Sequence, residues 1–142
     1  MDELVRWLDE QLAEDERIAQ AAPLGPWSMD GAGSIVDADG ERVVPSVGGT
    51  LNGRVSRWPE GPAAAQILGH DPARVLREID AKRRILALHV KDKYYDGCVI
   101  CDNGNNSCGC MSGWHWKYPC DTLKLLALPY ADGAGYREEW RP

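Results

Sequence analysis

The spacing of apolar residues at the start of the chain predicts a helix over residues 2–22. An approximate stripe at steps of three to four residues runs through Leu4, Leu8, Leu12, Ile18 and Ala22. Acidic residues fill the positions between them, as on the solvated face of an amphipathic helix. Pro23 and Pro26 cannot continue a helix, so they end it. We expect Trp27, the next aromatic residue, to anchor in the core.

Between residues 27 and 58 the pattern changes to short β-branched runs separated by glycine and aspartate. Two of these runs, Ser34–Asp37 and Glu41–Val44, flank the dipeptide Asp39-Gly40. Because Asp-Gly is typical of hairpin turns, we predict a hairpin there. A third short strand is predicted over 53–58, and the glycine-rich segment 48–53 is interpreted as a loose connection. Residues 27–58 together therefore indicate a small antiparallel β-meander.

Residues 62–90 are predicted to form two helices. The first is short and alanine-rich, over 62–68, and the second begins at Asp71-Pro72. Aspartate is a favoured N-cap, and proline suits the first helical position because its missing N–H needs no partner there. Helical spacing continues through Val75, Leu76, Ile79, Leu86 and Val90. A last short helix is predicted over 121–128, ended by Pro129.

The cysteines form a local group near the C-terminal end of the chain. All five lie within 23 residues, at Cys98, Cys101, Cys108, Cys110 and Cys120. No secretion signal precedes them and no apolar run reaches the ~18 residues of a membrane span, so we expect a cytoplasmic protein without a membrane partner. In that reducing compartment an odd number of thiols favours metal binding over disulfides.

The spacing Cys98-x-x-Cys101 can place two thiolates on one cation, and Cys120, at the start of a predicted helix, can add a third. The fourth ligand stays open among His89, Cys108, Cys110 and His115, because all lie within loop reach. Zinc is preferred over an iron-sulfur cluster, the alternative for a sulfur-rich set. A closed sphere of this kind leaves no position for water, so we favour a structural zinc over a catalytic one.

Charge is unevenly distributed along a chain whose net charge is −6. Residues 2–17 carry seven acids and two bases, net −5, whereas residues 72–93 carry seven bases and three acids, net +4. The basic segment suggests a nucleic-acid interface made by Arg74, Arg77, Lys82, Arg83 and Arg84. The acidic helix offers a partner of opposite sign, within the chain or in a homodimer, and such pairing would cancel much of this field.

Sequence motifs of common enzyme classes are missing. The sequence contains no Gly-x-Ser-x-Gly elbow, phosphate loop, dinucleotide fingerprint or His-Glu-x-x-His helix. His70, beside Asp71, has the chemistry of a base but is better interpreted as a helix-entry residue. His115, between two tryptophans, is better interpreted as part of a lid over the metal than as a base-stacking residue.

Several segments, spread over nearly the whole chain, resemble a family of small uncharacterised proteins from actinobacteria and their phages. The segments are Leu4–Leu8, Glu14–Ala19, Gly25–Trp27, His70–Ile79, Ala81–Ile85, Leu125–Asp132 and Tyr136–Trp140. Similar proteins carry a histidine after the long helix, a Cys-x-x-Cys and a Pro-Cys before the last helix. The resemblance therefore implies His89, Cys98, Cys101 and Cys120 as ligands, with Cys108 and Cys110 as additions to the pattern. It implies no catalytic role.

Taken together, the sequence predicts an α+β fold in a single domain over residues 1–142. The order is an N-terminal helix, the β-meander, a long basic helix, and a zinc knuckle with a short helix over 89–128. The tail 136–142 keeps two aromatic residues, so we expect it to dock. The predicted function is that of a non-enzymatic accessory protein that binds another protein and is encoded by an actinobacterium or a bacteriophage. The alternatives are a DNA-binding regulator using helix 72–93 and a small metal-dependent enzyme.

Overall fold

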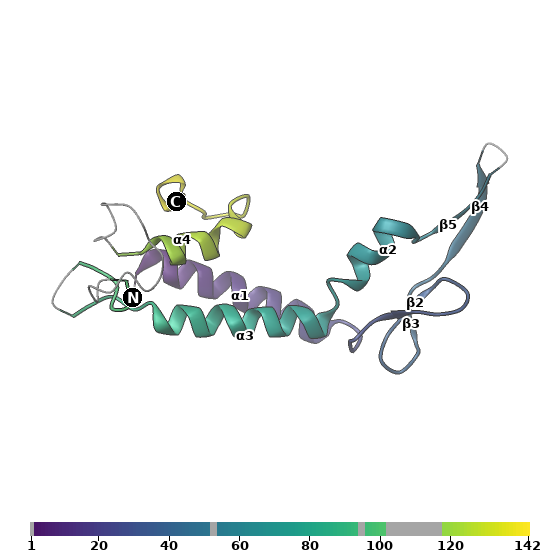
Figure 1. Cartoon of the computed structure of the whole chain (residues 1–142), viewed down its shortest axis with the longest axis horizontal. Helices are drawn as coiled ribbons and strands as arrows, with labels where there is room; N and C mark the ends of the chain where they lie inside the picture. Colours follow the sequence, from purple (N-terminus) through teal and green to yellow (C-terminus); the bar gives the residue numbers. More distant parts are fainter. Residues whose placement is uncertain (1, 52–53, 94–95, 102–117) are drawn as a thin grey trace. The chain divides into compact units, whose positions relative to one another are not determined.

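The computed structural model describes residues 2–51, 54–93, 96–101 and 118–142. Its elements follow one another along the chain as shown in Figure 1. They are α1 (Glu3–Ala21), β1 (Ser28–Met29), β2 (Ile35–Val36), β3 (Arg42–Val44), β4 (Val47–Leu51), β5 (Arg54–Trp58), α2 (Gly61–Leu68), α3 (Pro72–Leu88), α4 (Asp121–Ala127) and the short 3₁₀ helices η1 (Leu128–Tyr130) and η2 (Glu138–Trp140). The predicted α+β class is confirmed.

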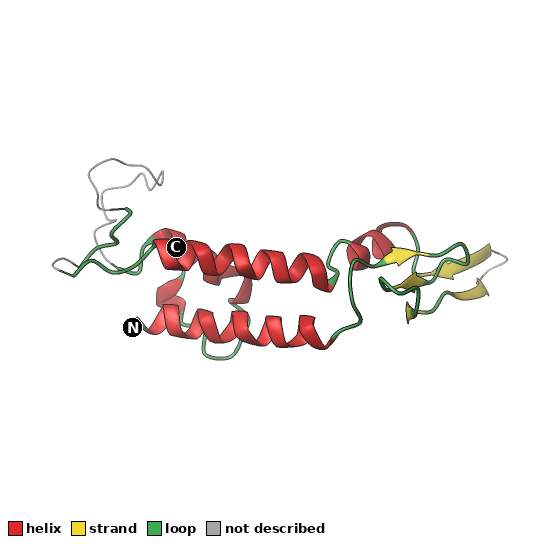
Figure 2. Cartoon of the chain, turned by 90° about the horizontal axis from the view of Figure 1, so that it is seen from below, coloured by secondary structure: helices red, strands yellow, loops and turns green. Residues whose placement is uncertain are grey.

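The chain divides into two compact units. Residues 15–78 form the first, which we call the strand unit because it holds all five strands, drawn in yellow in Figure 2. Residues 1–14 and 79–142 form the second, the helix unit, which contains α4, η1 and η2. The expectation of one domain over 1–142 stays a prediction.

The core of the helix unit is built from the apolar stripe of α1 and the inner face of α4. The fully buried side chains are Leu4, Leu8, Leu12, Leu123 and Ala127. The tail packs on this core through Trp7, whose indole N–H donates to the Ala134 carbonyl at 3.1 Å. Its ring lies 5.6 Å from that of Tyr136 and 5.3 Å from that of Trp140. The predicted docking of the tail is therefore confirmed.

In the strand unit, two consecutive loops are built in the same way. The side-chain Oδ1 of Asp30 accepts the N–H groups of Ala32 and Ser34, at 2.9 and 2.8 Å. Seven residues later Asp37 repeats the arrangement with the N–H groups of Asp39 and Glu41, at 3.0 and 2.8 Å. Both loops have a glycine with positive φ in the equivalent position, at Gly33 and Gly40, which a residue with a Cβ rarely adopts.

These loops connect the three antiparallel strands β1, β2 and β3, so the hairpin predicted around Asp39-Gly40 is confirmed. The predicted strand over 53–58 is present as β5. The loose connection expected over 48–53 is wrong, because β4 pairs with β5 from Val47↔Trp58 to Leu51↔Arg54. The dipeptide between the paired ends, Asn52-Gly53, is a strong hairpin signal that outweighs the glycines before it.

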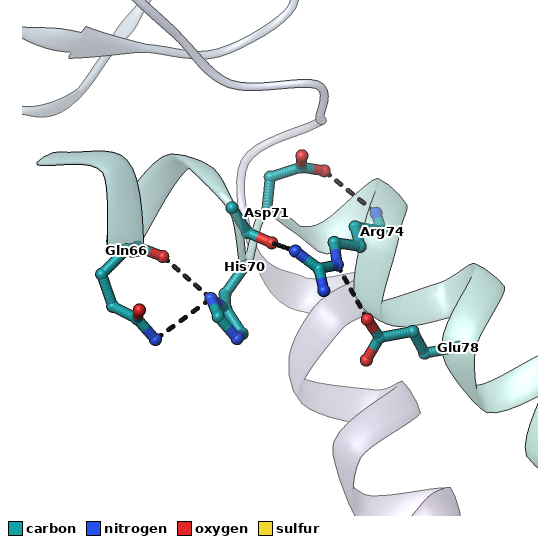
Figure 3. A network of polar contacts seen from close by, with 6 residues as sticks. Gln66, His70, Asp71, Arg74 and Glu78 are labelled. Carbon is teal, nitrogen blue, oxygen red and sulfur yellow. Dashed lines mark hydrogen bonds and ion pairs between the residues drawn. The ribbon is translucent and has the colours of Figure 1, made fainter. Parts of the chain in front are cut away.

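Helix α3 begins as the sequence predicts, and Figure 3 shows the polar network at its start. The Asp71 carboxylate accepts the Arg74 backbone N–H at 3.1 Å, the bond of an N-cap. The Arg74 guanidinium Nε donates to Oε1 of Glu78 at 2.7 Å and forms an ion pair with it. His70 donates its Nδ1–H to the Gln66 carbonyl at 2.9 Å, so it acts as the helix-entry residue that the sequence suggests.

The segment before β1 packs closely on this cap. A Cβ on Gly25 would lie 2.7 Å from Asp71 Oδ1 and 3.0 Å from the backbone nitrogen of Ala73. Trp27, which follows, is only half-buried. The expected core anchor is therefore wrong, because its indole N–H is satisfied locally, by the Pro23 carbonyl at 3.0 Å.

The substitution Gly25→Ala tests this close approach. Backbone atoms of Ala73 cannot move aside cheaply, so we expect the free energy of unfolding to fall by about 2 kcal/mol, as for overpacked interiors. Urea unfolding of the zinc-loaded protein measures the change. Gly31→Ala is the matched control, because nothing lies within 4 Å of a Cβ there. Equal stability of the two variants would contradict the close contact.

Candidate metal centre

The first candidate ligand, His89, is carried by the C-terminal end of α3. Its backbone N–H still donates to the Ile85 carbonyl at 3.1 Å, so the helical hydrogen bonding reaches this residue. The side chain is buried, and burial lowers the pKa of His89 below its usual value. A neutral imidazole is the form that binds a metal ion.

The chain then turns back and returns Cys98 toward the histidine. Lys91 and Cys98 form an antiparallel bridge, and the Val99 N–H donates to the Val90 carbonyl at 2.9 Å. Val90, expected on the apolar stripe of the long helix, instead lies two residues beyond Leu88, the last residue of α3, and is 47% exposed. Its backbone carbonyl accepts a hydrogen bond from the turn, where a helix end would leave it without a partner.

Tyr118 connects the approach to α4 with the other two segments. Its backbone N–H donates to the Asp96 carbonyl at 3.0 Å, and its hydroxyl donates to the His89 carbonyl at 3.3 Å. Burial raises the pKa of Tyr118 to about 12, so the hydroxyl keeps its proton and remains a donor. Two residues later, Cys120 occupies the N-cap position of α4 and is buried. Tyr118 was not among the predicted site residues, since nothing in its spacing marks it.

The three segments bring four ligand atoms to one point. Nδ1 of His89 lies 3.4 Å from Sγ of Cys98, 3.6 Å from Sγ of Cys101 and 3.5 Å from Sγ of Cys120. All four ligand atoms lie within 4.8 Å of one another. A tetrahedral zinc ion, with bonds of about 2.3 Å to sulfur and about 2.0 Å to nitrogen, separates nitrogen from sulfur by about 3.5 Å. The nitrogen-to-sulfur distances therefore fit a single zinc ion.

Electrostatics favour a cation among these sulfurs. Cys98 and Cys120 are buried, while Cys101 is half-buried. Burial, followed by the nearby Cys120 and Cys98, raises the pKa of Cys101 to about 12. Burial likewise raises the pKa of Cys120. Three thiolates are therefore unfavourable in so small a volume without a positive charge, and a metal ion that binds them must displace their protons.

The compactness of the cluster also bears on the kind of metal group. A cluster of two or four irons distributes its protein ligands over different iron atoms, which sets the ligands farther apart than a single ion does. Four ligand atoms gathered around one point are instead the arrangement of a mononuclear site with sulfur and nitrogen donors. The three cysteines and one histidine could thus hold one metal ion such as zinc.

Four further residues were candidates in the sequence. Cys108, Cys110 and His115 fall outside the described residues. His70 belongs to the strand unit and takes part in the network of Figure 3, not in the metal centre. None of the described helices is long and apolar enough to cross a membrane.

The fold and the cluster define an α+β protein with a candidate metal centre of three cysteines and one histidine. The chain belongs to a family of unknown function (DUF6221), whose model matches residues 1–142. The resemblance seen in the sequence is confirmed to that extent. No curated protein and no solved structure shows a significant match to the chain.

Replacing single ligands tests which side chains hold the metal. We expect Cys120→Ser and His89→Ala to reduce the zinc content from about one ion per chain to well below half of that, because each removes one of four bonds. Inductively coupled plasma mass spectrometry of the purified variants measures the ratio. Cys108→Ser and Cys110→Ser are the matched controls and should keep their zinc. Retention of zinc by His89→Ala with its loss from Cys110→Ser would reject His89 as the fourth ligand.

Proposed function

We propose that this chain is a non-enzymatic accessory protein that binds another protein and uses zinc to hold its helix unit together. The observation that carries the structural role is the set of four protein ligand atoms within 4.8 Å of one another, whose nitrogen-to-sulfur distances fit one tetrahedral zinc ion. Such a set fills the coordination sphere of zinc and leaves no position for a substrate or an activated water. This argues against the alternative of a small metal-dependent enzyme.

The metal would join three segments that backbone and tyrosine hydrogen bonds already bring together. His89 directly follows α3, Cys98 and Cys101 lie in the turn, and Cys120 is the N-cap of α4. Structural zinc sites contribute on the order of 10 kcal/mol of apparent folding free energy, which is comparable to the stability of a whole domain. We propose that zinc decides whether the part of the helix unit beyond α3 is ordered.

Binding of a protein partner is supported by apolar side chains on the surface of the helix unit. Leu88 is 59% exposed and Leu125 is 56% exposed, although both are large apolar residues. Exposed apolar groups of this kind are common at protein interfaces. We propose the cytoplasm as the compartment, because its reducing conditions keep thiols available to a metal. The actinobacterial or phage origin implied by the sequence resemblance stays a prediction.

The second candidate, a DNA-binding regulator, has weaker support. Its basic side chains are partly neutralised by carboxylates of their own unit: Arg83 lies 3.9 Å from Asp9, and Arg84 lies 3.8 Å from Asp80. Such exposed pairs add little stability, but they reduce the positive field that nucleic-acid binding requires.

Hydrogen exchange tests the structural role of zinc. We expect the amides of Asp92, Val99 and Tyr118, which donate to carbonyls of the turn, to be protected in the zinc-loaded protein and to exchange much faster after chelation. The Asp37 amide, bonded to the Glu41 carbonyl in the strand unit, is the internal control and should keep its protection. Equal protection of the turn with and without zinc would refute the proposal.

A salt titration tests the DNA-binding alternative. We expect no measurable binding of the zinc-loaded protein to double-stranded DNA at about 50 mM salt. The reason is that carboxylates of the chain offset part of the positive charge of residues 72–93. Fluorescence anisotropy with a labelled duplex measures it. Tight binding that weakens steeply with salt, and that is lost in Arg77→Ala, would favour the regulator instead.

A further inference from the structure

Strands β4 and β5 form a two-stranded ribbon in the strand unit. Five residue pairs join them, from Val47↔Trp58 to Leu51↔Arg54. Within the described part of the chain neither strand pairs with another, since β1, β2 and β3 form a separate sheet. Alternate residues on the outer edge of each strand therefore direct N–H and C=O groups away from the ladder. A two-stranded ribbon is only marginally stable alone, and an added strand would stabilise it.

The sequence of β4 favours the approach of another backbone. Gly48 and Gly49 occupy the strand interior, although each glycine costs about 0.5–1 kcal/mol there relative to alanine. Both residues are exposed, and nothing lies within 4 Å of a Cβ placed on Gly49. No packing inside the described chain explains this glycine. Glycine inside a strand often marks a place where a second backbone comes close.

An exposed apolar pair stands at the open end of the ribbon. Val47 and Trp58 are directly opposite each other, so their side chains share one face. Val47 is 61% exposed and Trp58 is 56% exposed. A tryptophan that leaves most of its surface in water is an anchor of the kind that dominates protein interfaces.

Charge indicates the chemistry of the partner. The sequence of the ribbon contains two arginines, Arg54 and Arg57, and no acidic residue. Arg57 is exposed, and its guanidinium donates to the Ala32 carbonyl across a long distance of 3.5 Å. A second copy of the ribbon would bring like charges together, whereas an acidic peptide would complement them. The charges therefore favour an acidic partner over self-association.

We propose that the open edge of β4 accepts an extended, acidic segment of a partner protein as an additional strand. Backbone hydrogen bonds along the edge would supply the affinity. Trp58 and Arg57 lie on β5, opposite Val47 and Gly48 of β4. Their long side chains would reach the added strand across β4 and select apolar and acidic side chains. This inference rests on the proposed function, because it names the surface and the partner chemistry of an accessory protein that binds another protein.

Fluorescence anisotropy with labelled peptides and the zinc-loaded full chain tests the proposal. The probe is a peptide of alternating glutamate and valine. We expect it to bind about tenfold more tightly than a peptide of alternating lysine and valine, because only the former complements the arginines. N-methylation of alternate peptide amides should weaken binding by about tenfold or more, because it removes the donors needed at the edge.

Matched variants locate the binding to the ribbon. Arg57→Glu should weaken binding of the glutamate peptide by about tenfold, while Arg42→Glu, the same charge change on an exposed residue of β3, should alter it less than about twofold. Equal binding of the glutamate and lysine peptides, no effect of N-methylation, or no binding at all would overturn the proposal. The zinc content and the hydrogen-exchange protection of the turn amides, measured on the same sample, test the proposed structural role of zinc independently. A failure of peptide binding alone therefore leaves that role standing.

Discussion

The convergence of three sulfur atoms on one imidazole nitrogen is the constraint on which the helix unit depends. Nδ1 of His89 lies between 3.4 and 3.6 Å from each of the three thiols, and these thiols come from two segments separated along the chain. Burial makes three thiolates unfavourable without a cation. The three cysteines can therefore all be deprotonated only when a metal ion balances their charge.

The neighbouring structure is arranged to deliver these four atoms. Hydrogen bonding of α3 extends to His89, and the turn returns Cys98 by an antiparallel bridge. Tyr118 then donates its hydroxyl hydrogen bond to the carbonyl of His89. It lies two residues before Cys120, the N-cap of α4. Buried leucines of α1 and α4 form the apolar core of the same unit. The apolar core and the four candidate ligands therefore belong to one unit.

Much of this could be predicted from the sequence where the signal is local. Helices α1 and α3 follow from apolar spacing, and the start of α3 follows from the capping chemistry of Asp71. The cysteine spacing pointed to the cluster, but spacing alone could not choose His89 over other residues within loop reach. That choice depends on where α3 ends and on how the turn folds back, which are tertiary properties.

The errors have the same origin. The glycines of β4 are typical of a loop, and they conceal a strand that pairs with β5 across the Asn52-Gly53 dipeptide. Trp27 was placed in the core by its size, whereas its polar N–H is bonded at the surface to Pro23. No sequence pattern marks Tyr118 as a site residue, because its role is a hydrogen bond to a residue 29 positions away. Propensity describes single elements, whereas these residues are determined by the hydrogen bonds that they make, over four positions for Trp27 and over 29 for Tyr118.

X-ray absorption spectroscopy at the zinc edge tests the central claim most directly. If one zinc ion joins His89 to the three cysteines, the spectrum of the purified protein will fit three sulfur neighbours at about 2.3 Å and one nitrogen at about 2.0 Å. A fit that requires four sulfurs, an oxygen ligand from water, or a second metal atom nearby would contradict it.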